Sequence, residues 1–331
     1  MIDLHGRRIR YLRLSVTERC NFRCRYCRPA KHGPLLDRRD ILTLEETARL
    51  AAIFVELGIN RIRLTGGEPL LRRNVLRLVN DLGSLAALDD LSLSTNAFML
   101  PEMAPSLKSA GVRRVNISLD SLTPETFSTI TRGGRLERVL KGIDAAVDAG
   151  LQPVKINMVV MGGVNSHEIA EMIRYASERG LLLRFIETMP MGQPGRDSMG
   201  VHVPSHEILA TIRTAFGNTV RAVPGTRGGG PARYFHVEGV GTDIGIISPL
   251  SQHFCDTCNR VRLTAGGDLV LCLGRRDRVN LLHPIRQGAS DDALAHTILE
   301  AISRKPGHHD FQRADAPHST PLPLRMVSLG G

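Results

Sequence analysis

The stretch YLRLSVTERCNFRCRYC, residues 11–27, decides the fold, because a strand-like run leads directly into three closely spaced cysteines. All six cysteines of the chain fall into two such triads, Cys20, Cys24 and Cys27 and then Cys255, Cys258 and Cys272. Three thiolates are one short of the four that close a structural zinc site or a common iron-sulfur cluster. Each triad therefore indicates a metal centre with one open coordination position.

The composition is typical of a globular protein with a substantial core. The 331 residues are 42% hydrophobic and 23% charged, which fits one large domain or two ordinary ones. The opening residues, MIDLHGRRIR, lack the apolar segment of a signal peptide, and no apolar stretch is long enough to span a membrane. We therefore expect a cytoplasmic protein, in which the cysteines serve as metal ligands in preference to three disulfides.

The net charge of +10 has two interpretations. It can belong to a solvated surface, or it can serve an anionic ligand or an acidic protein partner. Nucleic acid is a poor match, because the chain has four tyrosines, no tryptophan and no alternation of basic and aromatic residues.

From residue 10 to about residue 190, short β-branched runs alternate with helical stretches. Strands are predicted at residues 10–16, 61–64, 91–94, 113–119, 153–160 and 182–187. Helix starts are indicated by a capping box of Thr43 with Glu46, by Pro101 in a first turn, and by Ser166 as an N-cap. Strands joined by helices give a parallel sheet with right-handed crossovers. Six such units predict an α/β fold, a partial (β/α)6 barrel.

The pattern changes after residue 190, so we divide the chain into a barrel, residues 1–190, and a C-terminal region, residues 191–331. Two glycine-rich loops, MGQPGRDSMG and PGTRGGGPAR, flank a capped helix predicted at residues 205–216, and short strands are predicted between residues 234 and 248. We expect the segment from about residue 306 to be poorly ordered or draped over the surface.

The first triad has the spacing C-x3-C-x2-C directly after the first predicted strand. A loop at this place can wrap three thiolates around a [4Fe-4S] cluster and leave one iron without a protein ligand. The alternative is zinc, which needs a fourth ligand, and His32 is the nearest histidine.

With its surroundings, this motif resembles the signature of the radical S-adenosylmethionine (SAM) superfamily, C-x3-C-x-Y-C. The resemblance implies an open iron that binds the amino and carboxylate groups of SAM, and reductive cleavage of SAM to a 5′-deoxyadenosyl radical. A second element of that superfamily, GGEP at residues 66–69, stands at the end of the second predicted strand. The resemblance assigns SAM contacts to Tyr26, Gly66, Gly67, Glu68, Ser118 and Met189.

The second triad has the spacing C-x2-C-x13-C, which fits a second cluster as well as a zinc site with His253 or His283 as the fourth ligand. Arg260 and Arg262 follow its second cysteine, and alternate side chains of an extended segment point to one face. Two guanidinium groups can then converge on one anion, which a zinc knuckle does not need.

The pattern FCxxCNRxRLTxxG followed by CL, behind radical SAM motifs, resembles the family of molybdenum cofactor biosynthesis protein A, the GTP 3′,8-cyclases. The resemblance covers nearly the whole chain. It implies a second [4Fe-4S] cluster, whose free iron meets the guanine of GTP, and a C-terminal region that closes the barrel mouth. It assigns GTP contacts to Arg13, Arg63, Thr95, Lys155, Arg260, Val261 and Arg262, with Arg184 as a weaker addition. It gives catalytic roles to Arg260 and Arg262 and to the terminal Gly330 and Gly331, which would enter the barrel mouth.

The same resemblance implies that GTP is converted to 3′,8-cyclo-7,8-dihydro-GTP. It also implies several partners: a reduced flavodoxin- or ferredoxin-like electron donor, a second copy of the chain in a homodimer, and cyclic pyranopterin monophosphate synthase acting next.

One residue departs from the family pattern. Ala97 follows Thr95 and Asn96 where the family commonly has glycine. Because alanine disfavours positive φ, we expect a slightly different turn there.

Two rival functions remain at this stage. One is a radical SAM maturase of peptides or proteins with an auxiliary cluster, although such enzymes usually carry more cysteines. The other is a zinc-stabilised module that binds nucleic acid, which the charge would support but which leaves the GGEP motif and the βα array unexplained.

Overall fold

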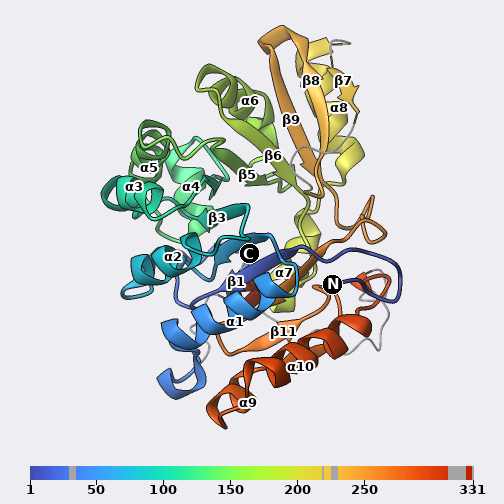
Figure 1. The fold of residues 1–331 in the computed structure, drawn as a ribbon. Helices are drawn as coiled ribbons and strands as arrows, with labels where there is room; N and C mark the ends of the chain where they lie inside the picture. Colours follow the sequence, from blue (N-terminus) through green and yellow to red (C-terminus); the bar gives the residue numbers. More distant parts are fainter. Residues whose placement is uncertain (30–34, 218–219, 225–229, 312–325, 330–331) are drawn as a thin grey trace.

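A computed structural model describes residues 1–29, 35–217, 220–224, 230–311 and 326–329. In this part of the chain, one sheet carries the strands in the order β12-β11-β10-β1-β2-β3-β4-β5-β6-β9-β8-β7 (Figure 1). Its centre is formed by β1 (Tyr11–Ser15), β2 (Arg61–Thr65), β3 (Asp90–Thr95), β4 (Arg114–Ser118), β5 (Lys155–Val159) and β6 (Leu182–Ile186). All neighbouring pairs from β1 to β6 are parallel. The six predicted strands and the α/β barrel architecture are thus confirmed.

Helices connect these strands and cover the outside of the sheet (Figure 1). They are α1 (Leu44–Glu56), α2 (Val75–Gly83), α3 (Leu100–Ser109), α4 (Pro124–Thr131), α5 (Leu136–Asp148) and α6 (Ile169–Glu178). The alternation along each strand explains the arrangement. On β1, Leu12 and Leu14 are fully buried in the core that faces the helices, while Tyr11 and Arg13 line the barrel interior. The polar face of the sheet is therefore inside the barrel.

The helix starts were partly predicted. The capping box is confirmed, because the Thr43 hydroxyl accepts from Glu46 N at 3.1 Å and the Glu46 carboxylate accepts from Thr43 N at 2.7 Å. Pro101 lies in the first turn of α3 as predicted. Ser166 as an N-cap is wrong: it begins a 3-10 turn, and α6 starts three residues later after Glu168.

The C-terminal region extends the sheet at both edges. Next to β6 lie β9 (Thr242–Ile247), β8 (Arg233–Val237) and β7 (Val220–Val223), and next to β1 lie β10 (Arg260–Leu263), β11 (Asp268–Val270) and β12 (Arg278–Asn280). Both joining strands, β9 and β10, run parallel to their barrel neighbours. The barrel therefore gains one parallel strand at each edge, which the sequence pattern did not predict.

The remaining helices belong to the C-terminal region, where α8 lies beside β7 and where α9 and α10 lie beside β11 (Figure 1). They are α7 (Gly192–Asp197), α8 (Ser205–Phe216), α9 (Leu282–Arg286), α10 (Asp291–Ser303) and α11 (Met326–Leu329). The bounds of α8 agree with the prediction, although its N-cap is Pro204 and makes no side-chain cap bond. In the described residues, no helix is long and apolar enough to cross a membrane.

Of the expected tail from about residue 306, poorly ordered or draped over the surface, the described part is packed against the protein. Phe311 is buried, and it packs in one apolar cluster with Met326 and Leu329 of α11, beside Met191 and Val270. Residues 312–325 and the predicted catalytic residues Gly330 and Gly331 lie outside the described residues.

Candidate functional site

Both cysteine triads open onto one cavity inside the barrel. Its lining includes all six cysteines. It also includes inward-facing side chains from every strand between β10 and β6. Among them are the cations that the sequence predicted to bind substrate, Arg13, Arg63, Lys155, Arg184, Arg260 and Arg262. Residues separated by more than 200 positions in sequence are thus brought to one site, and cations occupy the space between the two triads.

The first triad lies on the loop that follows β1. The N–H groups of Cys27 and Arg28 both donate to the Cys24 carbonyl at 3.0 Å, which folds the loop into a tight turn. The Cys20 sulfur accepts from Phe22 N at 3.4 Å and from the Asn96 side-chain amide at 3.8 Å. Hydrogen bonds to a ligating sulfur are a common way in which a protein tunes a metal cluster.

The thiols of this triad are poorly suited to exist as free thiolates. Burial, followed by the charge of Glu68, raises the pKa of Cys20 to about 11, and burial raises the pKa of Cys27 to about 12. Burial also raises the pKa of Cys24 well above its usual range. A bound metal supplies the positive charge that deprotonates such thiols. The donor set therefore fits a metal centre.

The triads do not form a preassembled site for a single ion. Within the described ranges, no three Cys, His, Asp or Glu side chains converge closely enough to hold one metal ion. A cubane accepts thiolates spread around several irons, whereas tetrahedral zinc draws all its ligands to one point. Of the proposed zinc ligands, His253 and His283 are exposed and do not line the cavity, and His32 lies outside the described residues.

The glycines of the GGEP motif are required by a close approach of two backbones. A Cβ on Gly67 would lie 2.3 Å from the carbonyl oxygen of Arg19, and one on Gly66 would lie 2.7 Å from that of Thr17. Two hydrogen bonds join the same segments, from Gly67 N to Thr17 O at 2.7 Å and from Glu68 N to Arg19 O at 2.8 Å. The motif therefore fixes the position of the cysteine loop.

The Glu68 side chain does not line the cavity. Its carboxylate accepts from the Thr95 hydroxyl at 2.8 Å, from Asn96 N at 2.7 Å and from Leu70 N at 3.1 Å. Burial nevertheless raises its pKa to about 7. Glu68 thus orients Thr95 and the turn after β3, which is a positioning role, although the sequence placed it among the cofactor contacts.

Asp120 is a site residue that the sequence analysis missed. It follows Ser118 at the end of β4, and its carboxylate accepts from the Tyr26 hydroxyl at 2.8 Å and from Val159 N at 2.9 Å. Burial raises its pKa to about 6. Asp120 thus fixes the ring of Tyr26 beside the first triad. Its position just after the end of a strand was the sequence signal that could have identified it. Ser118 and Met189, two other expected SAM contacts, both line the cavity.

The second triad is held by contacts that no local pattern reveals. Arg7 is buried, pairs with Asp3 at 2.7 Å, and donates to the carbonyl oxygens of Cys255, Pro306 and Gly307 at 2.9, 2.7 and 2.8 Å. It ties the N-terminal turn, the cysteine loop and the C-terminal segment together.

Cations surround the second triad. Burial alone would raise the pKa of Cys258, but Lys305 and Arg260 outweigh it and lower this pKa. Lys305 is buried, and its ammonium donates to the Leu271 carbonyl. Cys258 is thus better able to carry negative charge than the first-triad thiols, whereas burial raises the pKa of Cys255.

The cations between the triads are short of anions. Burial and neighbouring cations lower the pKa of Arg262 and of Arg184 to about 10 each, and that of Lys155 to about 7. The Nε atoms of Arg260 and Arg262 are buried and have no hydrogen-bond partner among the described residues. An anion with several oxygens would satisfy these donors and relieve the repulsion.

Val261 is the predicted GTP contact whose side chain the structure places elsewhere. It alternates with Arg260 and Arg262 on β10, is fully buried, and packs in the core opposite the cavity. Because side chains alternate along a strand, the periodicity that brings both arginines into the cavity keeps the Val261 side chain out of it.

The expectation that Ala97 alters its turn is not what the structure shows. Ala97 adopts φ +63°, the left-handed conformation that glycine favours. Such a conformation costs a non-glycine residue roughly 1–3 kcal/mol. Gly142 makes room for the turn, since a Cβ there would lie 2.1 Å from the Ala97 carbonyl oxygen.

Comparisons with known proteins agree with this geometry. Residues 14–176 match the model of the radical SAM superfamily, and residues 181–311 match that of the molybdenum cofactor synthesis C family. The chain is 46% identical to the GTP 3′,8-cyclase of Hydrogenovibrio crunogenus, over 100% of this chain and 99% of that protein. It is 47% identical to the GTP 3′,8-cyclase of Brucella canis, over 100% of this chain and 95% of that protein.

Among solved structures, Streptococcus suis SuiB bound to precursor peptide SuiA superposes with a TM-score of 0.62 at 12% identity, covering 94% of this chain and 74% of that one. Native anSMEcpe with bound AdoMet superposes with a TM-score of 0.58 at 14% identity, covering 91% of this chain and 82% of that one. At such identities the likeness shows the fold alone. The matches along the whole sequence show the family: the chain belongs to the GTP 3′,8-cyclases of the radical SAM superfamily.

Proposed function

We propose that this protein converts GTP to 3′,8-cyclo-7,8-dihydro-GTP, with SAM and two [4Fe-4S] clusters, as a step towards the molybdenum cofactor. The observation that carries the proposal is the single cavity onto which both cysteine triads open, with a set of cations short of anions between them. The family relationship implies SAM, one [4Fe-4S] cluster and GTP as substrate.

We assign the first cluster to Cys20, Cys24 and Cys27. When bound there with SAM, it supplies the 5′-deoxyadenosyl radical that takes the hydrogen from C3′ of the ribose. The chain itself orients SAM: Tyr26, held by Asp120, lies at the cavity wall, and the backbone of Gly66 and Gly67 can approach SAM without a side chain intervening. Ser118 and Met189 complete this end of the cavity.

GTP would lie between the triads. Arg13, Arg63 and Lys155 line the middle of the barrel, where they would neutralise the triphosphate. Arg260 and Arg262 supply buried Nε donors that no other group in the described residues satisfies. Thr95, oriented by Glu68, lines the wall nearer the first triad. By holding both reaction centres, C3′ and guanine C8, these residues convert ring closure into an intramolecular event.

We assign the second [4Fe-4S] cluster to Cys255, Cys258 and Cys272, which would hold it and leave one iron free to bind guanine. The cations that act on Cys258, Lys305 and Arg260, support a cluster with an anionic ligand over zinc. The electron would come from a reduced flavodoxin- or ferredoxin-like protein attracted by the net charge of +10. We further propose a homodimer in the reducing cytoplasm, with cyclic pyranopterin monophosphate synthase as the next enzyme. The terminal Gly330 and Gly331 would enter the barrel mouth.

The test is anaerobic turnover of the reconstituted protein with GTP, SAM and dithionite. The proposal expects 5′-deoxyadenosine and the cyclic nucleotide in comparable amounts. A variant without Gly330 and Gly331 should retain 5′-deoxyadenosine formation while cyclisation falls. Formation of 5′-deoxyadenosine with GTP recovered unchanged from the full chain would contradict the proposed function.

A further inference from the structure

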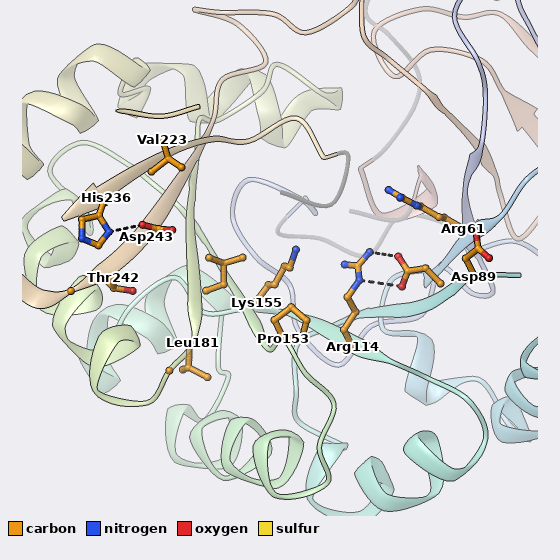
Figure 2. A pocket seen from close by; sticks show the side chains of 14 residues that line it. Arg61, Asp89, Arg114, Pro153, Lys155, Leu181, Val223, His236, Thr242 and Asp243 are labelled. Atoms are coloured by element: carbon orange, nitrogen blue, oxygen red, sulfur yellow. Dashed lines mark hydrogen bonds and ion pairs between the residues drawn. The ribbon is translucent and has the colours of Figure 1, made fainter. Parts of the chain in front are cut away.

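A second cavity, of about 1030 Å³, is lined by the side chains drawn in Figure 2, and no cysteine is among its lining residues. We call it the lower cavity. It is lined by residues at the beginnings of strands, such as Asp90 of β3, Leu182 of β6 and Thr242 of β9. The cysteine loop, by contrast, follows the end of β1. The two cavities therefore occupy opposite ends of the barrel interior.

Three cationic side chains line both cavities: Arg61, Arg114 and Lys155. We call these three residues the waist. They come from the first positions of β2, β4 and β5, the ends of these strands that line the lower cavity. Because these side chains line both cavities, a ligand that reaches them from the cysteine end also faces the lower cavity.

The charge at the waist is only partly balanced. Arg114 is paired with Asp90, its Nε donating to the carboxylate at 3.1 Å. Lys155 is buried, and the carboxylate whose charge acts on its ammonium is that of Asp90, which is already paired with Arg114. In Figure 2, Arg114 of β4 and Lys155 of the neighbouring β5 point into the lower cavity. The waist is thus suited to bind an anion, one side of which would remain accessible from the lower cavity.

Beyond the waist the lower cavity changes character. Its far wall carries the pair of His236 Nδ1 and Asp243 at 2.7 Å, together with the apolar side chains of Leu181 and Val223 (Figure 2). A hydrogen-bonded His–Asp pair and apolar surface do not demand a particular ligand there. They leave room for a flexible group whose anchor is at the waist.

We propose that the lower cavity receives a substituent attached to the terminal phosphate of the bound nucleotide, so that guanine nucleotides extended at the γ-phosphate are ligands of this protein. The inference rests on the proposed function, which places guanine near the second triad. The cations then lead the triphosphate downwards, and a γ-phosphate held by Lys155 directs its remaining oxygen towards the lower cavity. A closed barrel bottom would reject such nucleotides, whereas this one offers them space.

The test compares the binding of GTP with that of the γ-(6-aminohexyl) amide of GTP, by calorimetry on the anaerobically reconstituted full chain. Val223→Trp narrows the lower cavity. Ala222→Trp is the matched control, because Ala222 is the exposed neighbour on the same strand and does not line the cavity. Neither residue belongs to the proposed GTP or SAM contacts.

We expect the wild-type protein to bind the extended nucleotide within about fivefold of GTP. Val223→Trp should weaken the extended nucleotide at least tenfold and leave GTP unchanged, and Ala222→Trp should change neither. If the wild-type protein binds GTP but not the extended nucleotide, or if Val223→Trp affects both equally or neither, the inference is overturned. Failure of the wild-type protein to bind GTP itself would overturn the proposed function and this inference with it.

Discussion

Replacing Gly67 with alanine should displace the loop that carries the first triad. The new Cβ would lie 2.3 Å from the carbonyl oxygen of Arg19, 2.7 Å from its carbonyl carbon and 2.8 Å from the carbonyl oxygen of Glu18. These are backbone atoms, so no side-chain rotation can relieve the contacts. The loop must move, and the hydrogen bonds from Gly67 N and Glu68 N are then lost or stretched.

The magnitude follows from these contacts. Overpacking of this kind costs roughly 1–3 kcal/mol, and a lost hydrogen bond costs about 1 kcal/mol more. If about 2 kcal/mol of this falls on the bound state, the affinity for SAM drops roughly 30-fold. We expect this drop together with a changed electron paramagnetic resonance signal of the reduced first cluster on addition of SAM.

The assay is equilibrium binding of SAM to the reconstituted protein under anaerobic conditions. Gly200→Ala serves as the control, because a Cβ on Gly200 would meet no atom within 4 Å. Wild-type SAM affinity and an unchanged melting temperature in Gly67→Ala would refute the close-approach argument, and with it our account of why the motif contains these glycines.

Three further predictions concern charge. Burial, then Arg184 and other cations, lowers the pKa of Lys155 to about 7, so the amine is mostly neutral at pH 8. A bound triphosphate raises this pKa. GTP binding should therefore take up about one proton at pH 8 and little at pH 6. Calorimetry in buffers of different ionisation enthalpy measures this uptake, and equal uptake in Lys155→Met would contradict it. Arg7→Met leaves the buried Asp3 without its ion pair and should lower the iron content of the second triad while the first stays intact. The control Arg8→Met replaces an exposed arginine and should not lower it. Equal iron content in the two variants would contradict the role of Arg7 in holding the second triad. Alanine at both Arg260 and Arg262 should weaken GTP binding at least about 30-fold without affecting SAM cleavage, and lysine should not restore it; unchanged affinity would show that neither arginine contacts the nucleotide.

Much of the barrel was predictable, because its signals are local. The six central strands are short runs bounded by helices with readable ends, and the capping box at Thr43 fixed the start of α1. The inward face was also predictable in principle, since the alternation that buries Leu12 exposes Arg13 to the interior. Ser166 misled because it begins a 3-10 turn, so that α6 starts only at Ile169.

What could not be predicted depends on contacts between distant segments. Nothing near Arg7 indicates that it donates to Cys255 and Gly307. The parallel pairing of β10 with β1 brings Arg262 beside Arg13, and only this register explains why arginines from both ends of the chain share one cavity. The direction of the Glu68 side chain is likewise a tertiary fact, set by the turn after β3.

The most direct test of the account is the iron and sulfide content of the anaerobically reconstituted protein. Two cubanes predict about eight iron atoms and about eight sulfides per chain, and about four of each in Cys258→Ala, which should still cleave SAM but form no cyclic nucleotide. About four of each in the wild-type protein, with one zinc bound at the second triad, would contradict the claim that two open clusters face one substrate.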